Sequence, residues 1–178
     1  MKISKGEWLE IVENAISWIV VFAMMAYGLG KFVQFGNAHQ IDKPVSQLNG
    51  GQLMWAFYAY SKPYALIIGG MEVIGGILLL FRKTRILGCF LITTILFNVI
   101  LQDVFYGVPL GALRAAVLYQ SCLLVILWLN KERVKSIIKS FMVVKPSIKP
   151  VKHKLILLFL TFVLFIIFRI TEYYLTVY

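Results

Sequence analysis

The chain has 178 residues, of which 60% are hydrophobic and 15% are charged, and its mean hydropathy is +0.82. Soluble domains usually hold about half apolar and about a quarter charged residues, so this composition excludes an ordinary soluble protein and indicates an integral membrane protein. The formal net charge of +10 does not indicate nucleic-acid binding, because the basic residues lie between apolar segments. The expected partner of the apolar segments is the lipid bilayer.

Five apolar segments are long enough to cross a membrane, which takes roughly 20 residues per helix. They are residues 11–33, 63–81, 86–106, 111–130 and 154–174. The first is preceded by the acidic stretch GEWLEIVEN and lacks a small-residue cleavage site, so we expect it to stay as an anchor. The predicted fold is all-α: a single membrane domain over 1–178, with a four-helix core and a fifth C-terminal transmembrane helix.

The basic residues predict the orientation of these spans, because cytoplasmic loops hold an excess of lysine and arginine. Lys2, Lys5, the cluster at 82–85 and the basic residues that follow the fourth span all fall on one side of a five-span topology. The opposite side receives only Lys43 and Lys62 between the first two spans. We therefore expect a cytoplasmic N-terminus and an external C-terminus, with the bacterial inner membrane as the location.

Two connections have a character of their own. Residues 34–62 form an external loop rich in aromatic residues, which prefer the headgroup level, and a lid over a ligand is the alternative. Residues 131–153 form a basic, amphipathic cytoplasmic connection, which we expect to lie on the anionic leaflet.

A single carboxylate, Glu72, lies deep inside the second span. Charged groups at this depth cost on the order of 3 kcal/mol on insertion scales, so they tend to face the bundle interior and to have partners. Gly69, Glu72 and Gly76 share one helix face at i, i+3 and i+7. The two glycines are therefore candidate helix-packing residues that let a neighbouring helix enclose the carboxylate.

Other polar residues lie at similar or more external depth in the first four spans. Tyr27, Lys31 and Gln34 share a face of the first span, and Asn98 and Gln102 share a face of the third, with Asp103 next to it. We expect an outward-opening polar pocket with Glu72 as its floor and Asn98, Gln102 and Lys31 as its walls. The candidate ligand-binding or network residues are Glu72, Asn98, Lys31, Gln34, Gln102, Asp103, Arg114 and Tyr27.

A structural interpretation stands beside this one. Lys31 and Arg114 lie near enough to helix ends to reach the headgroups, and Asp103 would then cap its helix or pair with Arg114. Glu72 would form a neutral structural hydrogen bond. Arg169 and Glu172, three residues apart on the last span, are expected to form a local pair.

No catalytic motif is present in the sequence. His39 and His153 are expected on opposite sides of the membrane, which excludes a shared metal or haem site, and neither Cys89 nor Cys122 belongs to a CxxC pair. We expect both cysteines to be inert packing residues. No metal site and no catalytic activity of the chain on its own are predicted.

Several stretches resemble the DoxX-like family of small bacterial membrane proteins. They are YGLGKFVQF at the end of the first span, MEVIGGILLLF in the second, RKTRILG at the basic turn and NVILQDVFYGVPLG at the end of the third, so that the resemblance covers about residues 15–130. It implies a four-helix membrane bundle and a redox setting, since the family takes its name from a subunit of a thiosulfate:quinone oxidoreductase. By position, Lys31, Glu72, Arg85, Asn98 and Asp103 match polar positions of that family. The additional fifth span and the missing cysteine pair depart from its pattern.

Three functions follow as hypotheses. The first is an accessory subunit of a membrane redox system whose pocket binds a quinone or another small amphipathic ligand, with no other cofactor indicated. The second is a scaffold or assembly factor that contacts membrane or redox partner proteins or further copies of itself through its glycine faces and fifth helix. The third is a small transporter or proton pathway that uses Glu72 as a carrier site.

Overall fold

The structure is a computed structural model that describes residues 3–36, 41–142 and 150–177. Within these ranges the chain is all-helical, as the sequence predicts, and contains no strand. The elements in order are α1 (Lys5–Gly30), the short 3₁₀ helix η2 (Val45–Gln47), α2 (Gly50–Tyr60), α3 (Lys62–Leu80), α4 (Arg85–Phe105), α5 (Leu110–Leu129), α6 (Lys131–Met142) and α7 (Val151–Val177). His39, for which a position on the opposite side of the membrane from His153 was predicted, lies outside the described residues.

Five of these helices, α1, α3, α4, α5 and α7, are long and apolar enough to cross a membrane. They lie within a few residues of the five predicted spans. Helix α1 begins earlier than expected because Ser4 and Glu7 form a capping box, in which each side chain bonds the other residue's backbone N–H. The chain therefore has the helices of a helical membrane protein.

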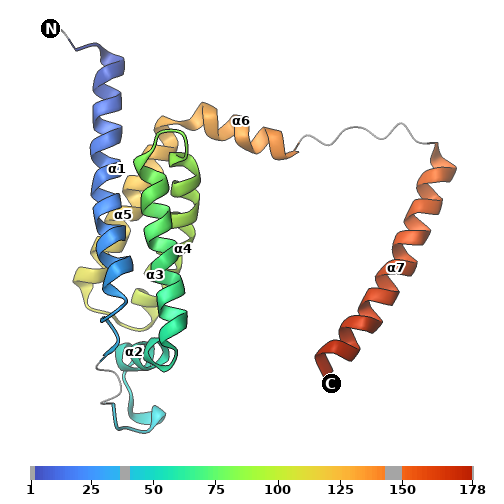
Figure 1. The fold of residues 1–178 in the computed structure, drawn as a ribbon, viewed down its shortest axis with the longest axis horizontal. Helices are drawn as coiled ribbons and strands as arrows, with labels where there is room; N and C mark the ends of the chain where they lie inside the picture. Colours follow the sequence, from blue (N-terminus) through green and yellow to red (C-terminus); the bar gives the residue numbers. More distant parts are fainter. Residues whose placement is uncertain (1–2, 37–40, 143–149, 178) are drawn as a thin grey trace. The chain divides into compact units, whose positions relative to one another are not determined.

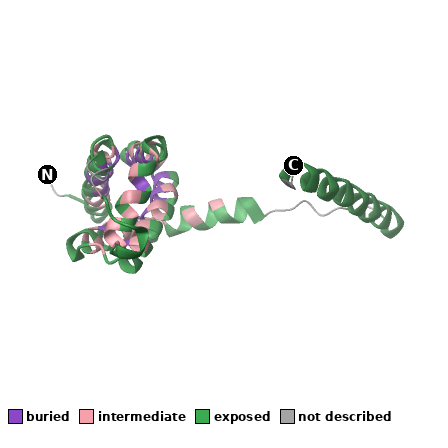
Figure 2. Ribbon diagram, turned by 90° about the horizontal axis from the view of Figure 1, so that it is seen from below, coloured by how far each residue is buried: buried purple, intermediate pink, exposed green. Residues whose placement is uncertain are grey.

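Four helices form one bundle, in which α1 packs against α3 and α5, and α4 packs against the same two helices (Figure 1). The buried residues of this bundle concentrate where the four helices face one another (Figure 2). The core consists of aliphatic side chains with Met24 and Cys89, and its fully buried members include Val20, Leu79, Ile92, Leu123 and Ile126. Cys89 is buried and unpaired, consistent with a packing role.

Helices α3 and α4 approach each other closely at two glycines. A Cβ placed on Gly88 would lie 2.8 Å from the backbone nitrogen of Leu79 and 3.0 Å from the carbonyl oxygen of Gly75. A side chain on Gly88 would therefore move the helices apart, whereas a Cβ on Gly75 would meet the side chain of Ile92, 2.5 Å from its Cγ1. Small residues at helix interfaces permit such packing, which replaces the hydrophobic driving force that lipid does not provide.

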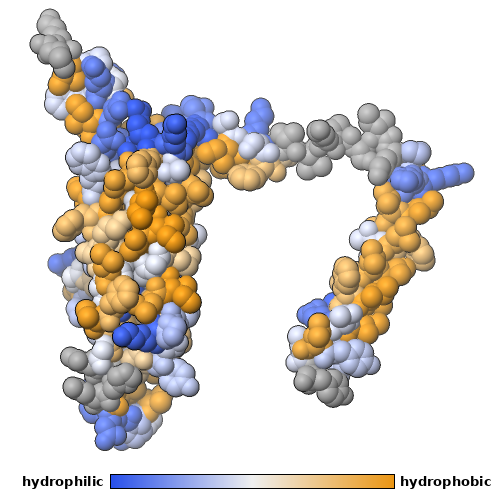
Figure 3. Space-filling view, viewed as in Figure 1, coloured by the Kyte–Doolittle hydropathy of each residue, from blue (hydrophilic) through white to orange (hydrophobic). Residues whose placement is uncertain are grey.

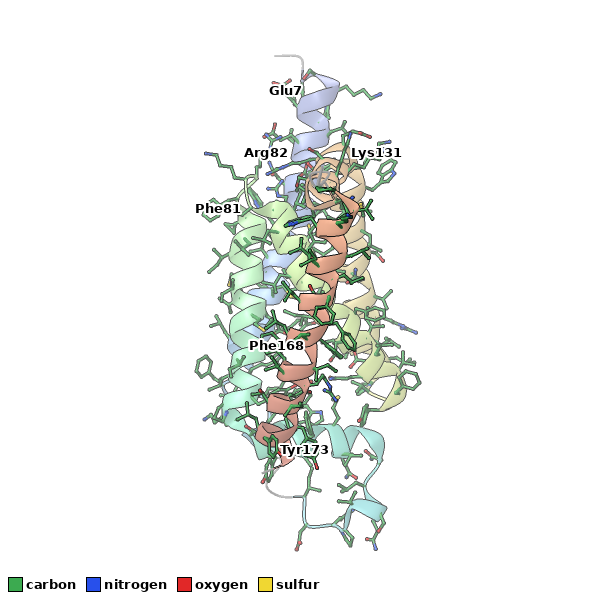
Figure 4. The ribbon with its side chains drawn as sticks, turned by 90° about the vertical axis from the view of Figure 1, so that its right-hand side faces the viewer. Glu7, Phe81, Arg82, Lys131, Phe168 and Tyr173 are labelled. Carbon is green, nitrogen blue, oxygen red and sulfur yellow. The ribbon has the colours of Figure 1, made fainter. Side chains whose placement is uncertain are left out.

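Arg85 ties one end of the bundle together. Its side chain is buried, and it donates to Glu13 Oε1 at 2.8 Å, to Asn14 Oδ1 at 2.8 Å and to the carbonyl oxygen of Leu79 at 3.1 Å. Polar residues gather at this end of the bundle above an apolar band (Figure 3). Glu7, Arg82 and Lys131 also lie toward this end, opposite to α2 (Figure 4). Arg85 belongs to the basic cluster from which the orientation is predicted, and its contacts give it an interhelical role that the sequence did not predict.

The predicted external loop 34–62 contains a helix, which corrects that expectation. Helix α2 begins after Asn49, whose side chain accepts from the backbone N–H of Gln52, while the Gln52 side chain accepts from the N–H of Asn49. Its residue Tyr58 packs with Phe35 and Ala65 in a second small cluster, with Phe35 and Tyr58 stacked at 5.0 Å between ring centroids. Helix α2 thereby lies across one end of the bundle, called the α2 end below (Figure 1).

The chain divides into two compact units, Met1–Ile138 and Lys139–Tyr178, which are described separately. At the start of α6, in the first unit, Arg133 donates to the carbonyl oxygens of Arg82 and Lys83 at 3.0 and 2.7 Å. In the second unit, α7 has no buried residue over the part described and carries the expected local pair of Arg169 with Glu172.

Candidate ligand cavity

An ion pair joins α1 to α3 near the α2 end of the bundle. The ammonium group of Lys31, at the end of α1, lies 3.0 Å from Glu72 Oε2 and 3.2 Å from Oε1. Glu72 is only 3% exposed, on the face of α3 that also carries Gly69 and Gly76. Both glycines abut α1, so the small face encloses the carboxylate as its spacing predicts.

A cavity of about 330 Å³ opens beside this ion pair. Its polar residues are Tyr27, Lys31, Gln34, Glu72 and Asp103, together with the ring of Trp55. Its remaining lining is Met54 from α2, Leu96 and Val99 from α4, and Val108, Pro109, Ala112 and Ala116 from the α4–α5 turn and α5. The volume falls within the range of about 300–1,000 Å³ that is usual for small-molecule sites, and a few polar groups in a mainly apolar wall are typical of them.

Asp103 contributes a second carboxylate to this cavity. It lies in the last turn of α4, is 6% exposed, and its Oδ2 has no hydrogen-bond partner among the described residues. Buried polar atoms nearly always have a partner, and each exception requires an explanation. The ammonium group that lines the same cavity, Lys31, already bonds both oxygens of Glu72.

Asn98 and Gln102 do not lie on the cavity wall where the sequence analysis placed them. They line a separate groove of about 440 Å³ with Tyr58, Tyr64 and Tyr106. In this groove Tyr58 donates to Gln102 Oε1 at 2.8 Å, and Gln102 donates to Asn98 Oδ1 at 2.8 Å. The reason is the rotation of α4: positions 96, 99 and 103 share the face toward the cavity, whereas 98, 102 and 106 share the next face.

Arg114 also differs from its expected place. It is exposed on α5 and has no ion-pair partner among the residues that the structure describes, so the pair with Asp103 that the alternative, structural interpretation offered does not form there. The structure thus brings together Tyr27, Lys31, Gln34, Glu72 and Asp103, and leaves Asn98, Gln102 and Arg114 outside the cavity.

The apolar wall was not predicted, and the α2 contribution was predicted only as the alternative in which residues 34–62 form a lid over a ligand. Met54 and Trp55 reach the cavity because α2 folds back over the end of the bundle, and the N-G-G-Q sequence at 49–52 was a readable capping signal for that helix. Leu96, Val99, Ala112 and Ala116 resemble any other apolar residues of a span, so nothing in the sequence marks them as cavity residues.

The chemistry available in this cavity is hydrogen bonding in an apolar enclosure. Lys31 supplies donors to an acceptor that enters, Asp103 and Glu72 supply acceptors, and the Tyr27 hydroxyl supplies either. Among the described residues there is no group of three or more histidine, cysteine or acidic side chains that would hold a metal ion. The arrangement is suited to holding a small ligand that has a polar head and an apolar body.

Comparison with known proteins gives one informative similarity. The chain is 28% identical over 123 residues to the uncharacterized protein YwoB of Bacillus subtilis (strain 168), an alignment that covers 67% of this chain and 77% of that protein. No family model matches the chain, and no solved structure matches it significantly. The class defined by the helices is that of a helical membrane protein with a cavity inside its bundle.

Proposed function

We propose that this protein is a DoxX-like accessory subunit of a bacterial inner-membrane redox system, and that its cavity binds a quinone or a similar small amphipathic ligand. The observation that carries the proposal is the cavity itself, where a buried Lys31–Glu72 pair and the Asp103 carboxyl face an otherwise apolar wall. A quinone carbonyl accepts hydrogen bonds of the kind that Lys31 and Tyr27 donate, while the ring packs against apolar side chains.

The position of the cavity supports this ligand class. Its lining comes from four spans and from α2, near the end of the bundle, where amphipathic molecules place their polar heads. Under the predicted orientation this is the external side of the membrane. Since the chain lacks a cysteine pair or a metal cluster within its described residues, electrons would reach such a ligand from a partner protein.

A scaffold role is the second candidate, and one observation favours it. Helix α7 is a long apolar span additional to the four-helix bundle, and an additional span is a candidate contact for other membrane subunits. The glycine faces do not support this role, because Gly69 and Gly76 already pack against α1. A scaffold therefore depends on α7, and removal of α7 would release the partner without affecting the cavity.

The ligand proposal is tested by filling the cavity. Ala112 lines the cavity from α5 and is itself exposed, so Ala112→Phe introduces a ring without displacing the buried core. The probe is a tail-free naphthoquinone, titrated into the protein in lipid nanodiscs, with quenching of tryptophan fluorescence as the readout, because Trp55 lines the cavity. Saturable quenching in the wild type and at least a tenfold weaker response in Ala112→Phe are expected.

The matched control is Leu118→Phe, on the same helix but at an exposed position away from the cavity lining. It adds the same ring and should quench like the wild type. Linear, non-saturating quenching that is the same in all three proteins would reflect partition into lipid and would overturn the proposal.

A further inference from the structure

The unpartnered oxygen of Asp103 indicates which hydrogen-bonding groups a ligand of this cavity must carry. Asp103 lines the cavity, and this one oxygen of its carboxyl group is buried and has no donor among the described residues. Leaving such an acceptor unpaired is energetically unfavourable, and more so when the group is charged. A ligand that donates a hydrogen bond here removes that cost, and one that only accepts does not.

The neighbouring groups do not supply the missing donor. Lys31 is bound by Glu72 through both carboxylate oxygens. Neither Tyr27 nor Gln34, which line the cavity and also carry a donor, bonds Asp103 Oδ2. Arg114 is exposed, on the side of α5 opposite to Ala112 and Ala116. The backbone carbonyl of Asp103 accepts from the N–H of Val108, but this bond does not involve the side chain.

Lys31 and Asp103 therefore differ in what they offer a ligand. The ammonium group of Lys31 is already neutralised by Glu72, whereas one carboxyl oxygen of Asp103 has no hydrogen-bond donor among the described residues. A neutral hydroxyl satisfies Asp103 while its aromatic or aliphatic body contacts Leu96, Val99 and Ala116. A cationic head would satisfy Asp103 as well, because the Lys31–Glu72 pair is neutral overall. The ligand class of the proposed function is uncharged, and a cationic probe is therefore included in the test.

We infer that the cavity selects ligands that donate a hydrogen bond to Asp103, so that it holds the hydroxyl-bearing quinol form of its ligand in preference to the quinone form. The inference rests on the proposed function and deepens it by naming the form that is bound. No electron transfer is assigned to the chain: the proposal concerns only which of two redox forms is held.

The test uses probes that differ in one donor. A naphthol and its methyl ether have the same ring, but only the naphthol donates a hydrogen bond. Each is measured by equilibrium dialysis against the protein in nanodiscs, with empty nanodiscs subtracted. We expect the wild type to prefer the naphthol over the ether by about 10-fold, which corresponds to one hydrogen bond of about 1.4 kcal/mol.

The variant Asp103→Leu, which is similar in size and lacks an acceptor, should bind both probes equally and should hold the ether as well as the wild type does. Asp103→Asn keeps an acceptor oxygen and should retain part of the preference, which separates loss of the acceptor from loss of folding. A naphthylmethylammonium probe that binds more tightly than the naphthol would overturn the choice of a neutral hydroxyl.

The two proposals fail in different ways. If the ether binds saturably and the naphthol binds no better, the cavity is a ligand site without donor selection, and only this inference is wrong. If the preference persists unchanged in Asp103→Leu, Asp103 is not its source. If no probe binds above the empty nanodiscs, both this inference and the proposed ligand site are contradicted.

Discussion

Gly28 and Gly69 face each other where α1 crosses α3, so closely that a Cβ built on either would lie 2.6 Å from the carbonyl oxygen of the other. This contact holds the two helices that carry Lys31 and Glu72. A side chain at either position must push α1 and α3 apart, because the nearest atom it meets is a backbone carbonyl oxygen, which cannot rotate away as a side chain can.

The variant Gly69→Ala should therefore destabilise the bundle by about 1–3 kcal/mol, the usual cost of overpacking. The matched control is Gly70→Ala, because a Cβ on Gly70 meets nothing within 4 Å. That change should be neutral or slightly stabilising, since alanine is the better helix former. Thermal unfolding in one detergent, followed by size-exclusion chromatography, compares the two, and equal melting temperatures would contradict the close crossing.

The Lys31–Glu72 pair should be costly to break and inexpensive to replace. Lys31→Met leaves a buried carboxylate without its cation and should cost about 3–5 kcal/mol, whereas Lys31→Met with Glu72→Met should recover most of that loss. Lys135→Met, which breaks an exposed pair with Glu132, should cost less than about 1 kcal/mol. A double variant as unstable as the single one would refute this account of the pair.

The same logic applies at the opposite end of the bundle. Arg85→Met removes three hydrogen bonds and leaves Glu13 without its cation, so we expect a loss of about 3 kcal/mol or more. Arg82→Met removes an exposed pair with Glu10 and should change stability by less than about 1 kcal/mol. Chemical denaturation of both variants in parallel measures the difference. If Arg85 served only to orient the chain in the membrane, the two variants would be equally stable.

Tyr58 should hold α2 on the bundle through its hydroxyl. Burial raises the pKa of this phenol above its usual value, so at neutral pH it stays protonated and keeps its bond to Gln102. The contribution is present below the unfolded pKa of about 10 and falls as the pH rises through the folded pKa. In Tyr58→Phe the α2 segment should be cleaved faster by protease at neutral pH, by a factor of about 5 for a bond of about 1 kcal/mol. In a titration followed by tyrosinate absorbance, the wild type should show one ionisation above pH 10 that Tyr58→Phe lacks.

Much of the fold is visible in the sequence, because apolar length alone identifies a span. The five long helices and the inward face of Glu72 follow from that length and from helical spacing. The partner of Glu72 was one of several cations near the same depth, and only the packing of α1 on α3 selects Lys31.

The cavity itself was harder to predict. Asn98 and Asp103 are five residues apart on α4, and the helix rotation that turns one toward the groove and the other toward the cavity depends on contacts with α3 and α5. Helix α2 was interpreted as a loop because its aromatic residues suggested the headgroup region, although its capping residues were present. Apolar residues of a span carry no signal that separates a cavity wall from a lipid-facing surface.

The central claim is that a small ligand occupies the cavity beside Lys31, Glu72 and Asp103. Glu72→Gln alone does not test it cleanly, because it leaves the Lys31 ammonium group without its partner. The most direct measurement is mass spectrometry of organic extracts from gently purified wild type, Ala112→Phe and Leu118→Phe. The account predicts a stoichiometric quinone or quinol in the wild type and in Leu118→Phe that is lost from Ala112→Phe. Equal amounts in all three proteins, or none in the wild type, would contradict it.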